Sequence, residues 1–137
     1  MHIDPSHENL VNLLAREVSG PVTMLNMLRF REIADYQFSP ELAPRDPISG
    51  REAYDRYIEH TLPYLQATGG SVTFMGEGGN FFIGPADERW DLVVLVHQAS
   101  IEEFFAFAAD EAYLAGIGHR TAALLDSRLL PLTVSEP

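Results

Sequence analysis

The sequence predicts an α+β fold in which one strand, helix, strand unit occurs twice. Alternating apolar residues predict strands, and apolar residues that recur every three or four positions predict helices. The expected strands lie at residues 22–30, 70–83, 90–98 and 127–134, and the expected helices at 51–68 and 100 to about 125. The resulting βαββαβ order predicts a ferredoxin-like domain with a four-stranded antiparallel sheet. Because this fold carries many unrelated activities, it does not by itself indicate a function.

The length of 137 residues suits a single domain built around one core. The expected parts of this domain, 1–137, are an N-terminal helical extension (1–20), a ferredoxin-like core (21–134) and, within the core, a long loop (31–50). In the extension, Ser6 is suited to cap a helix over 5–20 and Gly20 to end it. We expect this extra helix to pack across the core or against a partner subunit.

The charge and the absent residue types exclude several functional classes. With 20 acidic and 9 basic residues the net charge is -11, which disfavours nucleic acid and anionic membranes as partners. All basic residues are arginines, so lysine Schiff-base chemistry is excluded, and without cysteine there is no thiol nucleophile or thiolate metal site. No histidine pair or acidic loop has the spacing of a metal site, and we expect no metal and no cofactor. Neither a signal peptide nor a membrane span is expected, which favours a cytoplasmic protein.

The first expected strand has two apolar faces. One face carries Val22, Met24, Asn26, Leu28 and Phe30, and the other carries Thr23, Leu25, Met27 and Arg29. Strands that are covered on both sides have this pattern. One face should therefore meet the helices of its own chain, and a second copy of the chain is the expected cover of the other.

The long loop and the helix starts have clear local signals. Three prolines between residues 31 and 50 exclude a continuous helix, so this segment is a lid, a binding loop, a packed connection or a dimer arm. Ser49 with Glu52, and Ser100 with Glu103, match the S-x-x-E capping box. Later glycines predict a break near Gly116 in the second helix, and the glycine-rich run 76–80 predicts a bulge or tight bend.

Two polar residues on the strands are candidate catalytic groups. Asn26 interrupts an apolar strand, and its amide could donate a hydrogen bond to a substrate carbonyl or enolate oxygen. His97, on the face of the third strand shared with Asp91 and Val93, could act as a general base. The alternatives are structural: an amide that binds strand to loop, and a histidine that is hydrogen-bonded within the core.

Further residues are candidates for ligand binding. Arg29 and Arg120 could hold a carboxylate, and aromatic side chains could line a pocket for an apolar group. The aromatic candidates are Tyr54, Tyr57, Trp90 and Tyr113. The structural alternatives are an ion pair near a helix end for Arg120, and packing or a dimer interface for the aromatic rings.

The order of several short motifs resembles a known bacterial family. The motifs are NMLRFR at 26–31, GREAYDRY at 50–57, ERWDLVVLV at 88–96 and the later residues Tyr113, Arg120, Ala122 and Ser127. They resemble the uncharacterised family called domain of unknown function 1330, in the dimeric α/β-barrel superfamily. The resemblance implies a homodimer in which two four-stranded sheets face one another. It implies no single reaction, since that superfamily contains cofactor-free monooxygenases, isomerases, haem-degrading enzymes, chlorite dismutases and ligand binders.

Two functions follow as hypotheses. The first is a small-molecule-binding homodimer, in its enzymatic form a cofactor-free monooxygenase or isomerase, whose cleft between sheet and helices takes a small, partly apolar metabolite. Asn26 and His97 would then orient the substrate and move protons. The alternative is a non-catalytic dimer that binds a metabolite or another protein. The two hypotheses differ in whether Asn26 and His97 open into one cavity.

Overall fold

The computed structural model describes residues 1–137 and contains one four-stranded sheet. The strands are β1 (Val22–Phe30), β2 (Ser71–Asn80), β3 (Arg89–Gln98) and β4 (Leu124–Leu132). Their spatial order is β2-β3-β1-β4, and every neighbouring pair is antiparallel. The predicted α+β, ferredoxin-like arrangement with a four-stranded antiparallel sheet is confirmed.

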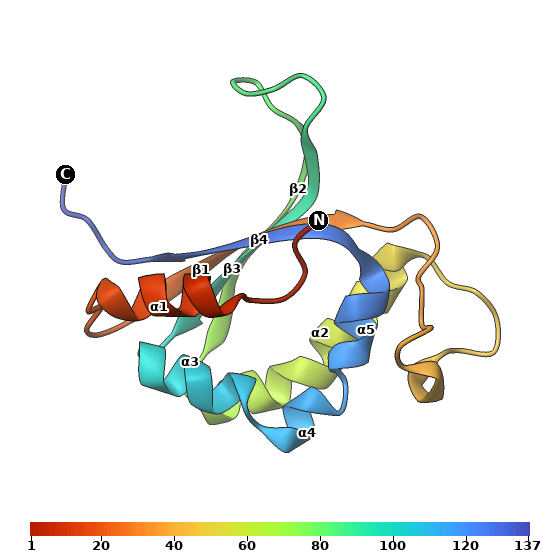
Figure 1. Ribbon diagram of the computed structural model, residues 1–137, viewed down its shortest axis with the longest axis horizontal. Coiled ribbons are helices and arrows are strands. Elements are labelled where there is room, and N and C mark those ends of the chain that lie inside the picture. The colour runs from red at the N-terminus through yellow and green to blue at the C-terminus, as the bar shows by residue number, and fades with distance from the viewer.

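The α-helices cover one side of this sheet (Figure 1). They are α1 (His7–Ala15), α2 (Gly50–Ala67), α3 (Ile101–Ala108), α4 (Glu111–Leu114) and α5 (Ile117–Ala123), and the long loop contains a short 3-10 helix, η1 (Pro40–Leu42). The β2–β3 hairpin projects beyond the side of the sheet that carries no helix (Figure 1). None of the helices combines the length and the apolar character that crossing a bilayer requires.

Some element boundaries differ from those expected. The second helical region is three short helices, and one of its breaks lies at Gly116, as predicted. The last strand begins at Leu124 rather than at residue 127, because the chain enters β4 directly from α5. The predicted bulge in the glycine-rich run 76–80 is wrong: pairing with β3 is regular there, and the register shift lies between Val72 and Phe74.

Serine side chains begin the helices as expected. The Ser6 hydroxyl accepts a hydrogen bond from the amide of Asn9, and Ser49 and Ser100 accept from amides three residues later in α2 and α3. Each bond satisfies one of the amides that a first helical turn leaves without a partner. These caps set where the helices start and so which of their faces meets the sheet.

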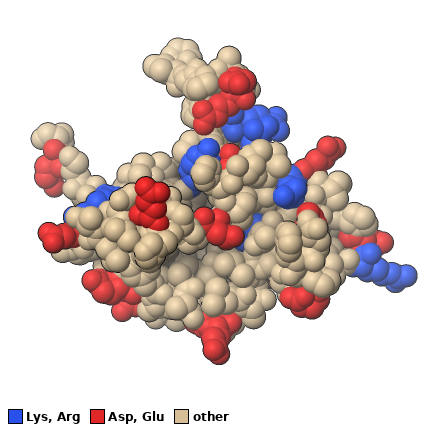
Figure 2. Space-filling view, in the orientation of Figure 1, with Lys and Arg blue, Asp and Glu red and all other residues tan.

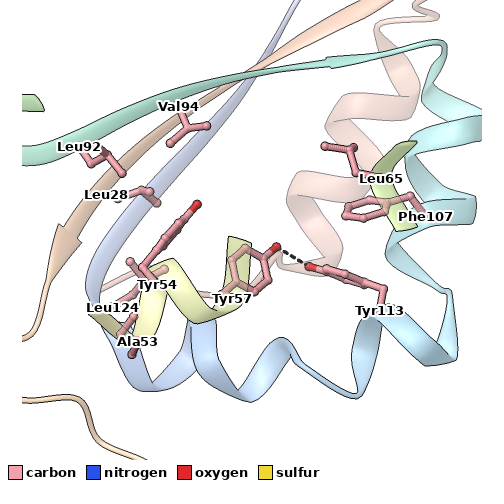
Figure 3. Packing of buried hydrophobic residues seen from close by; sticks show 11 residues of the cluster. Leu28, Ala53, Tyr54, Tyr57, Leu65, Leu92, Val94, Phe107, Tyr113 and Leu124 are labelled. Atoms are coloured by element: carbon pink, nitrogen blue, oxygen red, sulfur yellow. Dashed lines mark hydrogen bonds between the residues drawn. The ribbon is translucent and has the colours of Figure 1, made fainter. Parts of the chain in front are cut away.

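The main core lies between the sheet and the helices (Figure 3). From the sheet, Leu28, Leu92 and Val94 are at most 1% exposed, and they pack against aromatic and aliphatic side chains of α2, α3 and α4. A second cluster, with Val22 and Met24, lies where α1 and α3 approach the start of β1. The face of β1 that carries Val22, Met24 and Leu28 therefore meets the chain's own helices.

The other face of the sheet is apolar and has no helix over it. Leu25 of β1 lies between Leu95 of β3 and Leu130 of β4, and all three side chains are at least partly exposed. At the β2 edge, Phe74 pairs with Leu95 and is 54% exposed. We call this surface, together with Met27, Val93 and Leu132, the open face.

The long loop packs against α5 and the start of α2. The amides of Arg31 and Asp35 donate to carbonyl groups of α5, and the Gly50 amide donates to the Arg31 carbonyl. The Tyr36 hydroxyl is hydrogen-bonded to Nδ1 of His119 at 2.8 Å. The structure therefore shows a loop held to the helical layer by several hydrogen bonds.

His119 is expected to make stability depend on pH between about 5 and 7. Burial, helped by the charge of Arg56 and by His60, holds the pKa of His119 below its ordinary 6.5. As the pH falls below 6.5, the unfolded chain takes up the proton first, so the free energy of unfolding should decrease. Urea unfolding at several pH values should show a shallower decrease for His119→Gln than for the wild type.

The matched control for this experiment is His7→Gln, at an exposed position on α1. It should retain the pH dependence of the wild type. An unchanged slope in His119→Gln, or a stability that rises toward pH 5, would contradict the assignment.

Candidate functional site

Three tyrosines lie together between α2, α4 and the sheet (Figure 3). The α2 residues Tyr54 and Tyr57 have ring centroids 5.3 Å apart, and the Tyr57 hydroxyl is hydrogen-bonded to the hydroxyl of Tyr113 at 2.7 Å. Tyr54 and Tyr57 are one helical turn apart, so both rings leave α2 toward the core. The structure thus brings together three of the predicted aromatic residues.

The Tyr54 hydroxyl differs from the other two. The residue is only 4% exposed, its hydroxyl makes no hydrogen bond within the chain, and the group points toward the sheet near Leu28 and Val94 (Figure 3). Burial raises the pKa of Tyr54 well above its ordinary value, Tyr57 raises it further, and the positive charge of Arg120 offsets part of this effect. The phenol is therefore a neutral hydrogen-bond donor near an arginine.

Tyr113 is also neutral at physiological pH. Burial is the main cause of its raised pKa, and the neighbouring Tyr57, which shares the hydrogen bond, adds to it. Phe107 packs on the Tyr113 ring with centroids 4.3 Å apart. Since neither Tyr54 nor Tyr113 ionises near neutral pH, these groups can donate hydrogen bonds to a ligand but cannot serve as bases there.

Arg120 of α5 completes what we call the tyrosine–arginine cluster (Tyr54, Tyr57, Tyr113 and Arg120). Its Nη1 donates a hydrogen bond to the carbonyl oxygen of Ile3 at 2.8 Å. It takes part in none of the salt bridges of the structure, so the expected ion pair near a helix end is absent. The cluster therefore holds a positive charge without an acidic partner.

The two candidate catalytic residues lie on opposite faces of the sheet. Asn26 pairs with the buried Val94 and so faces the helices, where its amide donates to the carbonyl groups of Met24 and Val94. His97 pairs with Thr23 and Ser71 and shares its face with Leu95, on the open face. Because the sheet separates them, Asn26 and His97 do not open into one cavity within a subunit.

The remaining predicted ligand residues lie away from the tyrosine–arginine cluster. Arg29 shares its face of β1 with Leu25 and Met27, and its Nε is buried without a hydrogen-bond partner. Trp90 is buried outside both core clusters, donates from Nε1 to Glu88, and has the Arg128 guanidinium 5.1 Å from its ring centroid. Within one subunit, Arg29 and Trp90 therefore do not share a site with Tyr54.

A surface pocket of about 410 Å³ lies beside the N-terminal residues. It is lined by Ile3, Asp4, Arg31, Asp35, Phe38, Thr121 and Leu124. Arg31 has a buried Nε without a hydrogen-bond partner. Ile3 connects this pocket to the tyrosine–arginine cluster, because its carbonyl binds Arg120 while its side chain packs against the main core.

Two histidines of the helical layer, His60 and His119, are hydrogen-bonded within the fold. Nε2 of His60 is 2.8 Å from the Ala112 carbonyl oxygen, and His119 is bonded to Tyr36. No group of three or more histidine, aspartate or glutamate side chains is placed to hold a metal ion. Figure 2 shows acidic side chains scattered over the side of the molecule in view, with fewer basic ones between them.

Sequence reasoning missed two parts of this site. Ser127 is 6% exposed on β4 and donates from its hydroxyl to the carbonyl of His2 at 2.6 Å. The N-terminal residues that meet Ser127 and Arg120 come from the far end of the chain. A buried serine within an apolar strand is a weak signal, and irregular N-terminal residues have no periodic pattern that could place them.

A solved structure of a close relative shows the family of this chain. The RPA0582 protein of unknown function from Rhodopseudomonas palustris has 35% sequence identity over 99% of this chain and 98% of its own, with a TM-score of 0.83. This chain belongs to the RPA0582 family. The crystal structure of methylated RPA0582 gives 34% identity over 99% of this chain and 96% of its own, with a TM-score of 0.86.

A more distant structure supports the fold of the RPA0582 family. A dimeric protein of unknown function with a ferredoxin-like fold, from Bacteroides fragilis, has 9% identity over 83% of this chain and 96% of its own, with a TM-score of 0.50. At this identity the likeness concerns the fold alone. No family model and no curated protein matches the chain.

Proposed function

We propose that this protein is a homodimer that binds a small, partly apolar metabolite at the tyrosine–arginine cluster, between its sheet and its helices. The observation that carries the proposal is the hydroxyl of the buried residue Tyr54, which makes no hydrogen bond within the chain and lies near the charge of Arg120. A phenol donor that has no partner within the chain is available to a ligand oxygen, and that hydrogen bond would add to the affinity. The surrounding aromatic rings would contact the apolar part of the ligand.

The open face supports the dimer. Apolar side chains across three strands remain partly exposed, and a sheet with one uncovered apolar face gains stability when a second copy covers it. The β2–β3 hairpin projects on this side, and Phe82 and Ile83 at its tip are 102% and 87% exposed. The Bacteroides fragilis protein of similar fold is described as dimeric.

We further propose that the RPA0582 family falls within domain of unknown function 1330 and the dimeric α/β-barrel superfamily, which the motif order supports.

Binding without catalysis is the form that the geometry favours. A cofactor-free enzyme that uses Asn26 and His97 together requires both side chains at one ligand. Asn26 faces the helices and His97 the open face, so one ligand cannot contact both within a subunit. The groups that do lie together are neutral phenols and an arginine, which are suited to hold a ligand through hydrogen bonds and charge.

The proposal is tested with a thermal-shift screen of small organic acids, aromatic compounds and neutral metabolites, followed by calorimetry of the compounds that stabilise the protein. Tyr54→Phe should weaken binding of such a compound by about tenfold, because it removes one buried hydrogen bond. Light scattering at micromolar concentration should give the mass of a dimer.

The matched control is Tyr64→Phe, which removes a hydroxyl on the same helix. The Tyr64 hydroxyl makes no hydrogen bond in the structure, and Tyr64 is not one of the buried residues of the core cluster. It should leave affinity unchanged. Equal losses in both variants, or no loss in Tyr54→Phe, would place the ligand elsewhere. A monomeric mass would contradict the dimer.

A further inference from the structure

The N-terminal residues 2–4, which we call the strap, lie beside β4, and the chain runs from there toward α1 (Figure 1). Two hydrogen bonds join the strap to β4: the His2 amide donates to Oδ1 of Asp126 at 2.8 Å, and the Ser127 hydroxyl donates to the His2 carbonyl at 2.6 Å. The Ile3 side chain is partly buried against the main core. The strap is therefore held by a few specific contacts and belongs to no helix or strand.

The strap supplies a neutral acceptor to a charged donor. The guanidinium of Arg120 binds the carbonyl of Ile3 at 2.8 Å and no carboxylate, although the chain has 20 acidic residues. The bond from Arg120 to the Ile3 carbonyl has one charged partner, whereas a carboxylate adds a second, opposite charge and can accept two parallel N–H bonds from the guanidinium. A carboxylate would thus be a better partner for Arg120 than the strap carbonyl is.

We propose that the strap is displaceable and that a small carboxylate with an apolar body takes its place. The carboxylate binds Arg120 and accepts a hydrogen bond from the Tyr54 hydroxyl, and the apolar body occupies the position of the Ile3 side chain. This inference rests on the proposed function, because it assigns the ligand class and the regulation of the same site. Ser127 loses its bond to His2 when the strap opens and becomes available to a second ligand oxygen.

The surroundings of the strap favour this exchange. The pocket of about 410 Å³ borders Ile3 and Asp4, so open space lies next to the strap. Displacement also carries the negative charge of Asp4 away from the site, which favours an anionic ligand. A ligand that needs the open strap has an apparent affinity proportional to the fraction of molecules in which the strap is open. Loosening the strap raises this fraction and should therefore tighten binding.

The test measures binding of benzoate, with benzamide as its uncharged counterpart, to the 137-residue chain by calorimetry. We expect benzoate to bind at least about tenfold more tightly than benzamide, because only benzoate carries a charge for Arg120. Ile3→Gly removes the side chain that packs the strap against the core and keeps the strap backbone. It should bind benzoate about tenfold more tightly than the wild type.

The control for the variant is Val134→Gly, which removes an aliphatic side chain in the exposed C-terminal tail and should leave benzoate affinity unchanged. A second measurement needs no destabilising substitution. The imidazole proton signals of His2, assigned with His2→Gln, should shift as benzoate saturates the wild-type protein, since His2 leaves β4 with the strap.

Three results would overturn the inference: equal affinity for benzamide and benzoate, an unchanged benzoate affinity in Ile3→Gly, or no benzoate binding to either protein at about 10 mM. If neutral compounds bind and Tyr54→Phe weakens them, the strap inference fails and the proposed function survives. If no compound binds, or Tyr54→Phe has no effect on those that do, the proposed function itself fails.

Discussion

Replacing Gly50 by alanine is expected to destabilise the protein by about 3 kcal/mol, because the added methyl group has no space. Gly50 is the buried first residue of α2, and its amide donates to the Arg31 carbonyl. A Cβ atom there would overlap the carbonyl oxygen of Arg31 and lie 2.7 Å from that of Ala123. Both obstacles are backbone atoms, so no side-chain rotation relieves the clash. Thermal unfolding should show a melting temperature lower by about 10 °C.

The matched control is Gly79→Ala in β2, where an added Cβ meets no atom within 4 Å. This variant should change stability by no more than about 0.5 kcal/mol. If the two alanine variants melt at the same temperature, the close approach of the loop, α2 and α5 at Gly50 is not as the structure shows it.

Placing a charge on the open face is expected to separate the proposed dimer. Leu95 lies near the middle of that face, beside Leu25 of β1 and Phe74 of β2. In Leu95→Arg an unpaired guanidinium would have to be buried between two apolar sheets, which raises the dissociation constant by at least about 100-fold. Sedimentation equilibrium should then show a monomer at concentrations at which the wild type is a dimer.

The control for this substitution is Leu114→Arg, at a leucine of α4 that is 40% exposed on the helical side. It introduces the same charge and should leave the dimer intact. Because Leu95 points away from the main core, the far-UV circular dichroism of Leu95→Arg should match that of the wild type. A persistent Leu95→Arg dimer would mean that subunits associate through another surface.

Much of the fold could be predicted because its signals are local. The alternation in residues 22–30 predicts a strand, and the structure has β1 at the same residues. Ser49 and Ser100 predict helix starts, because a hydroxyl near the first amides of a helix is a short-range interaction. The extent of β4 was less clear, since α5 leads into this strand without a turn.

The candidate site was predictable only in part. Helical spacing indicates that Tyr54 and Tyr57 share one face of α2, and the structure places both beside Tyr113. Alternation shows which residues of one strand share a face, but the match between the faces of two strands depends on their register. Asn26 pairs with Val94, and this register places His97 on the opposite side of the sheet.

The sequence by itself determined the order of the strands and helices, the helix caps and the presence of two apolar faces on β1, because each depends on residues a few positions apart. Only the tertiary structure decided which residues meet at the site. The Arg120 contact with Ile3 and the Ser127 contact with His2 join residues more than a hundred positions apart. Such contacts result from how the packed layers bring the N-terminus onto β4 and α5, and no local pattern in the sequence encodes them.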